Sequence, residues 1–250
     1  MPAAPTTIVG VSTKAYLGWR DSLDWVDRVH DLLVAAPLSA GTRLFVVPSF
    51  PVIPAAVERL APLGVIVGAQ NVAVSAGALT GEVSAGMLRE LGVGIVEVGH
   101  AERRSVFQET DDVVRTKLAA VLAEGMTPLL CVGEPDEGDP ATAAAFCADQ
   151  IASAITGNES RLAEVIVAYE PVWAIGAAEP APVAHIVGVV AALRRALADR
   201  YATSVGQIIY GGSAGPGLLA TLPTVDGLFL GRFAHNPANL RIVLDEAEAR

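Results

Sequence analysis

Short apolar runs recur along the whole chain and alternate with segments of helical pattern. The runs lie at 7–12, 43–49, 65–70, 94–100, 127–133, 165–170, 206–212 and 227–232. They are nearly continuous in apolar residues, which is typical of strands in a parallel sheet covered on at least one face. Each run other than the seventh precedes a segment with a helical signal. The pattern therefore predicts repeated β-then-α units.

Helix start and stop signals support this division. Ser22 precedes an amphipathic segment, and Thr110 precedes two acidic residues, as at the start of a helix. The helix after Thr110 is expected to stop near Gly125. Two further starts pair an N-cap residue with a proline at the first helical position, Asp139-Pro140 and Asn236-Pro237.

Eight such units in 250 residues predict an α/β fold of the (β/α)₈ barrel type, with residues 1–250 as a single domain. A doubly wound open sheet is the competing architecture, because alternation alone does not separate the two. The count of eight and the lack of a G-x-G-x-x-G after the first run favour the barrel. No linker or low-complexity stretch divides the chain.

Composition excludes several classes of protein. Hydrophobic residues make up 52% and charged residues 18%, which excludes disorder for most of the chain. A net charge of −10 argues against nucleic acid or an anionic membrane as partner. A small anionic substrate held by local donors stays compatible with that charge. No apolar run is long enough to span a bilayer, and no signal peptide is recognisable, so we expect a soluble cytoplasmic protein.

The residues that could take part in catalysis or binding stand at the ends of the apolar runs. Lys14, the Gln70-Asn71 pair, His100 and Glu170 all stand at run ends, where a barrel places its active site. A histidine at a helix start has its charged form disfavoured by the helix dipole. A carboxylate base, a neutral histidine and a lysine suit proton abstraction beside a carbonyl.

Glycine-rich segments after the last runs indicate an anion site. YGGSAGPG (210–217) and LGR (230–232) fall where barrels bind phosphate through backbone N–H groups, and Gly176 is placed to close over the same anion. These features together favour an isomerase or lyase of a phosphorylated sugar. Each feature alone is weak, because a strand-end histidine or a Glu-Pro turn is usually structural. We assign no role to the remaining histidines, His30, His185 and His235, and Cys131 and Cys147 read as packing residues without metal-ligand spacing.

Several motifs resemble the triosephosphate isomerase family. They are GHAERRSVFQETDDVV, CVGE, AYEPVWAIG and YGGS, in register from about Val9 to Leu244. The resemblance implies a (β/α)₈ barrel that forms a tight homodimer, needs no metal or other cofactor and isomerises its substrate through an enediol. A glutamate base paired with a neutral histidine is the mechanism known for this family, so the pairing is taken over from the family.

The resemblance also implies roles for individual residues. Lys14 corresponds to the lysine that orients the substrate, and Glu102 to the glutamate that orients that lysine. His100 corresponds to the neutral electrophile and Glu170 to the base. The phosphate would be held by backbone N–H groups of Gly176, Ser213 and Gly231.

Some positions depart from the family pattern. Ser12 replaces an asparagine that reaches the substrate, Ala101 replaces a serine, and Arg232 stands where a glycine is expected. The loop GAAEPAP (176–182) has prolines and an acid in place of glycine and lysine, which predicts a stiffer hinge. Ser12 and Arg232 are therefore the positions that would contact a changed substrate.

Three hypotheses follow: an isomerase of triose phosphate, the same chemistry on a four-carbon ketose phosphate such as erythrulose phosphate, or an idle barrel kept for binding or assembly. The intact Lys14, His100 and Glu170 count against the third. The mostly small and apolar loop 71–82 predicts a homodimer, since in the family it inserts beside the partner's active site. Thr80 corresponds to the residue that reaches that site.

Overall fold

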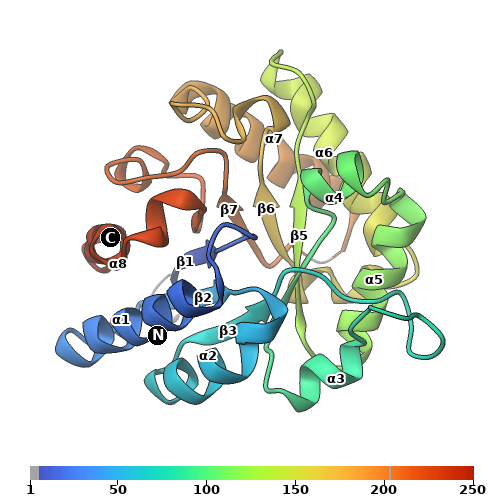
Figure 1. Cartoon of the computed structure of the whole chain (residues 1–250). Coiled ribbons are helices and arrows are strands. Elements are labelled where there is room, and N and C mark those ends of the chain that lie inside the picture. The colour runs from blue at the N-terminus through green and yellow to red at the C-terminus, as the bar shows by residue number, and fades with distance from the viewer. Residues whose placement is uncertain (1–5, 203) are drawn as a thin grey trace.

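The apolar runs form a closed parallel barrel in the computed structural model, which describes residues 6–202 and 204–250. The strands follow one another around the barrel in chain order, and β8 pairs with β1 to close it (Figure 1). Their bounds are β1 (Thr7–Ser12), β2 (Thr42–Val47), β3 (Ile66–Ala69), β4 (Ile95–Val98), β5 (Thr127–Val132), β6 (Ile166–Tyr169), β7 (Gln207–Tyr210) and β8 (Gly227–Leu230). The predicted (β/α)₈ barrel is confirmed, and the open sheet is excluded.

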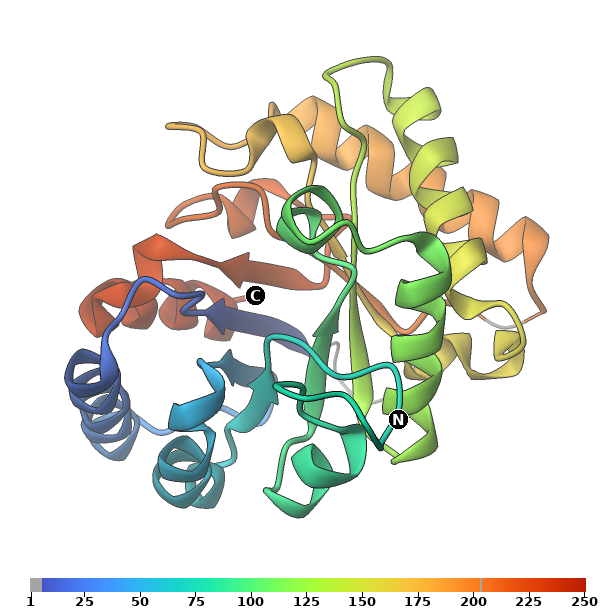
Figure 2. The same ribbon diagram turned by 45° about the vertical axis from the view of Figure 1, so that its right-hand side comes forward.

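Helices surround the strands on the outside (Figure 2). Between β7 and β8 the chain forms only a short 3₁₀ helix, Leu219–Thr221, in agreement with the weak helical signal there. The interval between β4 and β5 instead contains two helices. The bounds are α1 (Trp19–Ala35), α2 (Ile53–Leu60), α3 (Ala85–Glu90), α4 (Ala101–Val106), α5 (Asp111–Ala123), α6 (Pro140–Ile155), α7 (Val183–Arg200) and α8 (Pro237–Glu248).

Most predicted helix starts are confirmed by their caps. The side chains of Thr110, Asp139 and Asn236 each accept a hydrogen bond from a backbone N–H in the first turn of their helix. The start inferred at Ser22 is wrong, because α1 begins at Trp19 and Ser22 lies buried inside it. The first turn of α1 carries an exposed Trp19, so the burial pattern there gives no signal of helical periodicity.

Two apolar layers hold the barrel together. The larger one lies between the strands and the helices. The smaller one fills the barrel interior and consists of Ile8, Phe45, Val47, Ile95, Leu129, Cys131, Ile166, Ala168, Ile209 and Phe229. Because side chains alternate along a strand, residues two apart on one strand share a face, so residues beyond this inner layer reach the carboxyl mouth of the barrel.

Two kinds of feature are absent from residues 6–202 and 204–250. No helix in these ranges is long and apolar enough to cross a membrane. No group of three or more His, Cys, Asp or Glu side chains in the same ranges is arranged to hold a metal ion. The expectation that the reaction needs no metal or other cofactor stays a prediction.

Candidate active site

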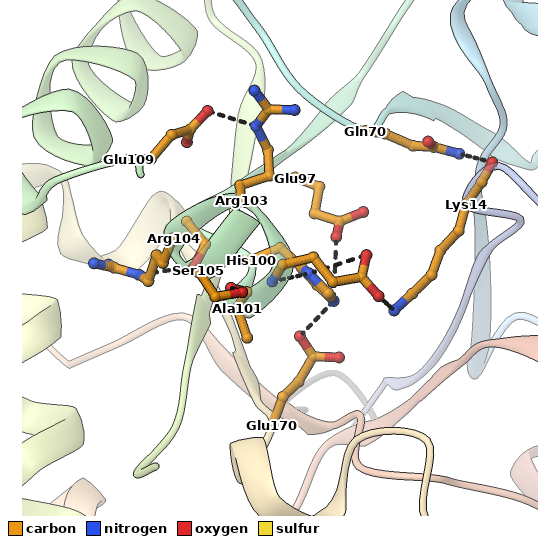
Figure 3. Close-up of polar contacts among 12 residues, drawn as sticks. Lys14, Gln70, Glu97, His100, Ala101, Arg103, Arg104, Ser105, Glu109 and Glu170 are labelled. Atoms are coloured by element: carbon orange, nitrogen blue, oxygen red, sulfur yellow. Dashed lines mark hydrogen bonds and ion pairs between the residues drawn. The ribbon is translucent and has the colours of Figure 1, made fainter. Parts of the chain in front are cut away.

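The predicted chemical residues converge at the carboxyl ends of the strands. His100, Lys14 and Glu170 come from the ends of β4, β1 and β6, and Figure 3 shows their side chains directed at one region. His100 Nε2 lies 3.6 Å from Glu170 Oε2. An open cavity of about 1070 Å³ reaches this region and is lined by Ser12, Lys14 and Glu170 among others. The three residues thus lie together in one site, as expected.

Lys14 is held in an unusual backbone conformation. Its φ is +47°, in the left-handed region that a residue with a side chain rarely adopts. The Lys14 carbonyl accepts hydrogen bonds from Ser49 Oγ at 2.9 Å and from Gln70 Nε2 at 3.0 Å, and these bonds fix the turn. Gln70, one of the strand-end residues noted in the sequence, therefore supports Lys14.

An ion pair directs the Lys14 side chain across the site. Lys14 Nζ lies 2.6 Å from Glu102 Oε1. Burial lowers the pKa of Lys14, but the hydrogen bond and charge of Glu102 outweigh burial, so the pKa is raised overall. Burial likewise raises the pKa of Glu102, yet the hydrogen bond from Lys14 leaves it lowered overall. Both groups are therefore charged at neutral pH.

His100 caps α4 with its own ring. His100 Nδ1 accepts a hydrogen bond from the backbone N–H of Glu102 at 3.1 Å. A ring nitrogen that accepts cannot carry a proton, so a neutral His100 carries its proton on Nε2. Nε2 faces Glu170, and the tautomer set by the cap therefore presents a hydrogen-bond donor to the site.

Glu170 is buried at the start of the loop after β6. A Cβ on Gly211 would lie 2.5 Å from Glu170 Oε1, so a residue with a side chain at position 211 would displace the carboxylate. Glu170 Oε2 has no hydrogen-bond partner. A buried carboxylate oxygen without a partner is free to accept a proton from a bound molecule.

The predicted phosphate-binding residues line the same cavity, namely Gly176, Ser213, Gly231 and Arg232. Ser213 has a φ of +51°. Its hydroxyl oxygen lies 3.0 Å from the Ala174 carbonyl oxygen and 2.9 Å from the Ala177 carbonyl oxygen, and the hydroxyl can donate to either. The exposed Arg232 donates from Nη2 to the Gly176 carbonyl at 3.4 Å. The guanidinium therefore stands beside the cavity rather than filling it.

The loop over the cavity, 171–182, is tied at both ends. Near its end, the Ala181 N–H donates to Tyr210 Oη at 2.9 Å. Near its start, Trp173 Nε1 donates to Glu134 Oε1 at 3.0 Å. His185 Nε2 lies 3.0 Å from the same Glu134 oxygen. His185, which was given no role from the sequence, therefore pairs with Glu134 from a distant part of the chain.

Sequence reasoning missed two buried acids that shape the site. Glu134 anchors the loop as described, and its only signal was its place in the CVGE motif. Glu97 lies on β4, and its Oε1 is 4.0 Å from His100 Nε2 (Figure 3). The signal for Glu97 was available, since an acidic residue interrupts the apolar run 94–100.

A buried polar cluster supports the site from outside. Lys117 Nζ donates to Asn71 Oδ1 at 2.7 Å and pairs with Glu109, which also accepts from Arg103 Nε at 2.5 Å. Burial lowers the pKa of Lys117. The cluster joins the loop after β3 to α4 and α5, and it gives Asn71, the second member of the strand-end pair, a structural role.

Comparisons with known proteins agree with this geometry. The triosephosphate isomerase family model matches residues 7–247. The L-erythrulose-1-phosphate isomerase of Pectobacterium atrosepticum is 47% identical over 245 residues, which cover 96% of this chain and 95% of that protein. The L-erythrulose-1-phosphate isomerase of Mesorhizobium japonicum is 37% identical over 248 residues, covering 96% and 97%. The triosephosphate isomerase of Thermus thermophilus is 43% identical over 195 residues, covering 74% and 78%.

The closed barrel, the site at its carboxyl end and the near full-length match to the family model all indicate the same family. The resemblance to the triosephosphate isomerase family is confirmed by the family model and by relatives that are 47% and 43% identical to this chain. The chain belongs to the triosephosphate isomerase family and is an isomerase of a small phosphorylated sugar.

Proposed function

We propose that this enzyme interconverts four-carbon ketose phosphates, with L-erythrulose 1-phosphate as substrate. The observation that carries the proposal is the 47% identity to a relative of that name over 96% of the chain. The sequence motifs alone placed triose phosphate first, and the comparisons favour the four-carbon alternative instead. The assembled site and the isomerase relatives argue against an idle barrel.

The proposed substrate differs from dihydroxyacetone phosphate by one hydroxymethyl group. That group replaces a hydrogen on the carbon from which the base removes a proton. In the proposed reaction, Glu170 takes the proton from C3 and the electron pair forms a C2–C3 enediolate. His100 donates the Nε2 proton to the oxygen on C2 and takes one from the oxygen on C3. Glu170 then returns its proton to C2, which leaves the carbonyl at C3 and all atoms balanced.

The surrounding charges suit this sequence of proton transfers. Lys14 places its ammonium group where negative charge develops on the enediolate oxygens. The ion pair with Glu102 holds that ammonium in position. As the resemblance implies, His100 acts as a neutral ring, and its Nε2 donates one proton and then takes one back. We propose that these four residues have the roles that the resemblance implies.

The phosphate is proposed to occupy the glycine-rich part of the cavity. Backbone N–H groups of Gly176, Ser213 and Gly231 would bind its oxygens, as glycine-rich loops do at helix and strand ends. Arg232 adds a cation that can contact a phosphate through two N–H groups. Glu102 and Glu170 also line the cavity, and their negative charge disfavours a phosphate dianion close to them.

The cavity volume does not by itself choose between three and four carbons. At about 1070 Å³ it is large for either sugar phosphate. The choice must therefore come from the polar groups at the reacting end. Steady-state rates on a panel of three- to five-carbon sugar phosphates test the proposal, with Glu170→Gln as the control for contaminating isomerases. The highest kcat/KM is expected for L-erythrulose 1-phosphate, and a higher value for a triose phosphate would contradict the proposal.

We also propose that the enzyme is a homodimer. The loop 71–82 projects beyond the barrel between β3 and α3 (Figure 1), and it includes Leu79, which is 36% exposed, and the exposed Thr80. Met87 on α3 and Phe107 after α4 are also exposed. Large apolar side chains at a surface are typical of contact with a partner. Sedimentation at micromolar concentration should give twice the chain mass, and a 25.8 kDa species alone would contradict the dimer.

A further inference from the structure

A buried carboxyl group that the proposed mechanism does not use stands beside the reacting atoms. Glu97 lies on β4 two residues after Ile95, which belongs to the inner apolar layer, so its side chain also points into the barrel. Its neighbours Val96 and Val98 belong to the outer layer. Glu97 is 4% exposed, so the carboxyl group is closed off from bulk water.

The Glu97 carboxyl lacks a full set of partners. Its Oε1 is 4.0 Å from His100 Nε2, too far for a hydrogen bond, and its Oε2 has no hydrogen-bond partner. Burying a polar group without a partner costs free energy, because the hydrogen bonds to water are lost and not replaced. A group held at that cost inside an active site is a candidate for contact with a ligand.

The pKa of Glu97 is shifted in the opposite direction from that of Glu102. Burial raises its pKa to about 7, against an ordinary value of 4.5, and the charge of Glu170 adds to the effect. At neutral pH a large share of Glu97 is therefore the uncharged acid. In that form it both donates and accepts a hydrogen bond, which matches the needs of an alcohol.

A second polar atom without a partner lies on the same interior surface. Ser12 ends β1 and is 3% exposed, and its hydroxyl oxygen has no hydrogen-bond partner. Ser12 lines the cavity. Ser12 follows Val11, which pairs with Leu230 of β8, so Ser12 lies beside the predicted phosphate-binding Gly231. Glu97 instead stands on β4, across the barrel from β8.

We infer that Glu97 binds the hydroxymethyl group that distinguishes a four-carbon ketose phosphate from a triose phosphate. The inference rests on the proposed function. The hydroxymethyl group is attached to the carbon that Glu170 deprotonates, and Glu170 and Glu97 approach the same His100 nitrogen from different directions (Figure 3). A substituent on that carbon therefore points toward Glu97 when the carbon faces Glu170.

The inference explains how the substrate is oriented. A phosphate dianion at this end would meet Glu97, Glu170 and Glu102, whereas a hydroxyl group there gains hydrogen bonds. The phosphate is left to the glycine-rich end beside Arg232. Glu97 is thus a residue that determines specificity, while proton transfer at carbon stays with Glu170.

The first test compares two substrates in one variant. In Glu97→Val, the ratio of kcat/KM for L-erythrulose 1-phosphate to that for dihydroxyacetone phosphate should fall by about 10², since a site built for a hydroxyl loses that advantage. Glu97→Gln keeps a donor and an acceptor and should lower the ratio by less than about tenfold. Glu58→Gln, an exposed change on α2, is the matched control. An unchanged ratio in Glu97→Val would overturn the inference.

The second test needs no variant to fold. An analogue of L-erythrulose 1-phosphate with a terminal methyl group in place of the hydroxymethyl group is given to the wild-type enzyme. Its kcat/KM should be lower than that of the natural substrate by about 10². Equal values would overturn the role of Glu97. Failure of the proposed function is a separate result, because it appears as wild-type enzyme that prefers dihydroxyacetone phosphate.

Discussion

The two ends of the barrel interior use the same strands for opposite purposes. Near the amino-terminal ends, Ile8, Ile95 and Leu129 pack into an apolar layer. Further along β1 and β4, the inward positions are Ser12 and Glu97, while on β5 Cys131 still belongs to the apolar layer. Four residues along β1 and two residues along β4, the inward side chain therefore changes from apolar to polar.

The polar end carries an energetic cost that the apolar end does not. Side-chain oxygens of Ser12, Glu97 and Glu170 are buried there without hydrogen-bond partners. Burial, with the nearby charges of Glu170 and Glu97, also raises the pKa of the Cys131 thiol well above its usual range. Stability from the apolar layer permits this arrangement, and a bound substrate would satisfy the free oxygens.

The largest effect should come from breaking the polar end at Glu170. Glu170→Gln removes the base and should lower kcat by about 10² to 10⁴, because a positioned general base contributes that much. The change is nearly isosteric, so the unfolding midpoint should stay close to that of the wild type. Steady-state assays and thermal unfolding check the two quantities, and kcat within about threefold of the wild type would show that another group is the base.

Breaking the apolar end should act on stability. Ile95→Ala leaves a cavity in the inner layer, and its free energy of unfolding should fall by about 2–5 kcal/mol. Denaturant titration measures this loss. A loss below about 0.5 kcal/mol would mean that the inner layer contributes little.

The third prediction uses the pH dependence of Glu97. In the unfolded chain its pKa is the ordinary 4.5, and in the folded protein it is about 7, so the folded state holds the proton more tightly. Wild-type stability should therefore fall as the pH rises from 4.5 to 7, relative to Glu97→Gln, which cannot ionise. At about 1.4 kcal/mol per pH unit the relative change is of the order of 3 kcal/mol.

Unfolding of both proteins across pH 4 to 8 checks this value. Titrating groups far from Glu97 affect both proteins equally and cancel in the difference. The groups that interact electrostatically with Glu97 do not cancel fully, and they are His100, Glu170, Lys14 and Glu102. A difference between the two proteins that stays constant with pH would contradict the raised pKa.

The smallest expected effect concerns substrate preference and the two departures from the family pattern, Ser12 and Arg232. Ser12→Asn restores a larger amide near the reacting carbon, and Arg232→Gly removes the cation beside the phosphate. The double variant should shift the kcat/KM ratio toward triose phosphate by about tenfold, or roughly 1.4 kcal/mol. A shift toward the four-carbon substrate would show that these two positions do not set the preference for four carbons over three.

Local patterns predicted most of the fold and the meeting of Lys14, His100 and Glu170 in one site. The strand runs, the caps at Thr110 and Asp139, and the strand-end places of His100 and Glu170 all depend on short stretches of sequence. The same reasoning placed the start of α1 too late. Trp19, the first residue of α1, is exposed, so the helical spacing of buried apolar residues begins only further along the helix.

What the sequence could not provide depends on closure of the barrel. His185 meets Glu134 across 51 positions of the chain, and no local pattern indicates that contact. The acid at Glu97 is visible in its strand, but its burial, its missing partner and its distance from His100 appear only when eight strands close around it.

The most direct test of the central claim is a competition in one solution. Wild-type enzyme receives equal concentrations of L-erythrulose 1-phosphate and dihydroxyacetone phosphate, and both are followed by NMR. The ratio of initial rates then equals the ratio of the two kcat/KM values, independent of enzyme concentration. We predict that the four-carbon substrate is consumed at least about tenfold faster, which corresponds to roughly 1.4 kcal/mol at the transition state. Faster consumption of dihydroxyacetone phosphate would contradict the claim.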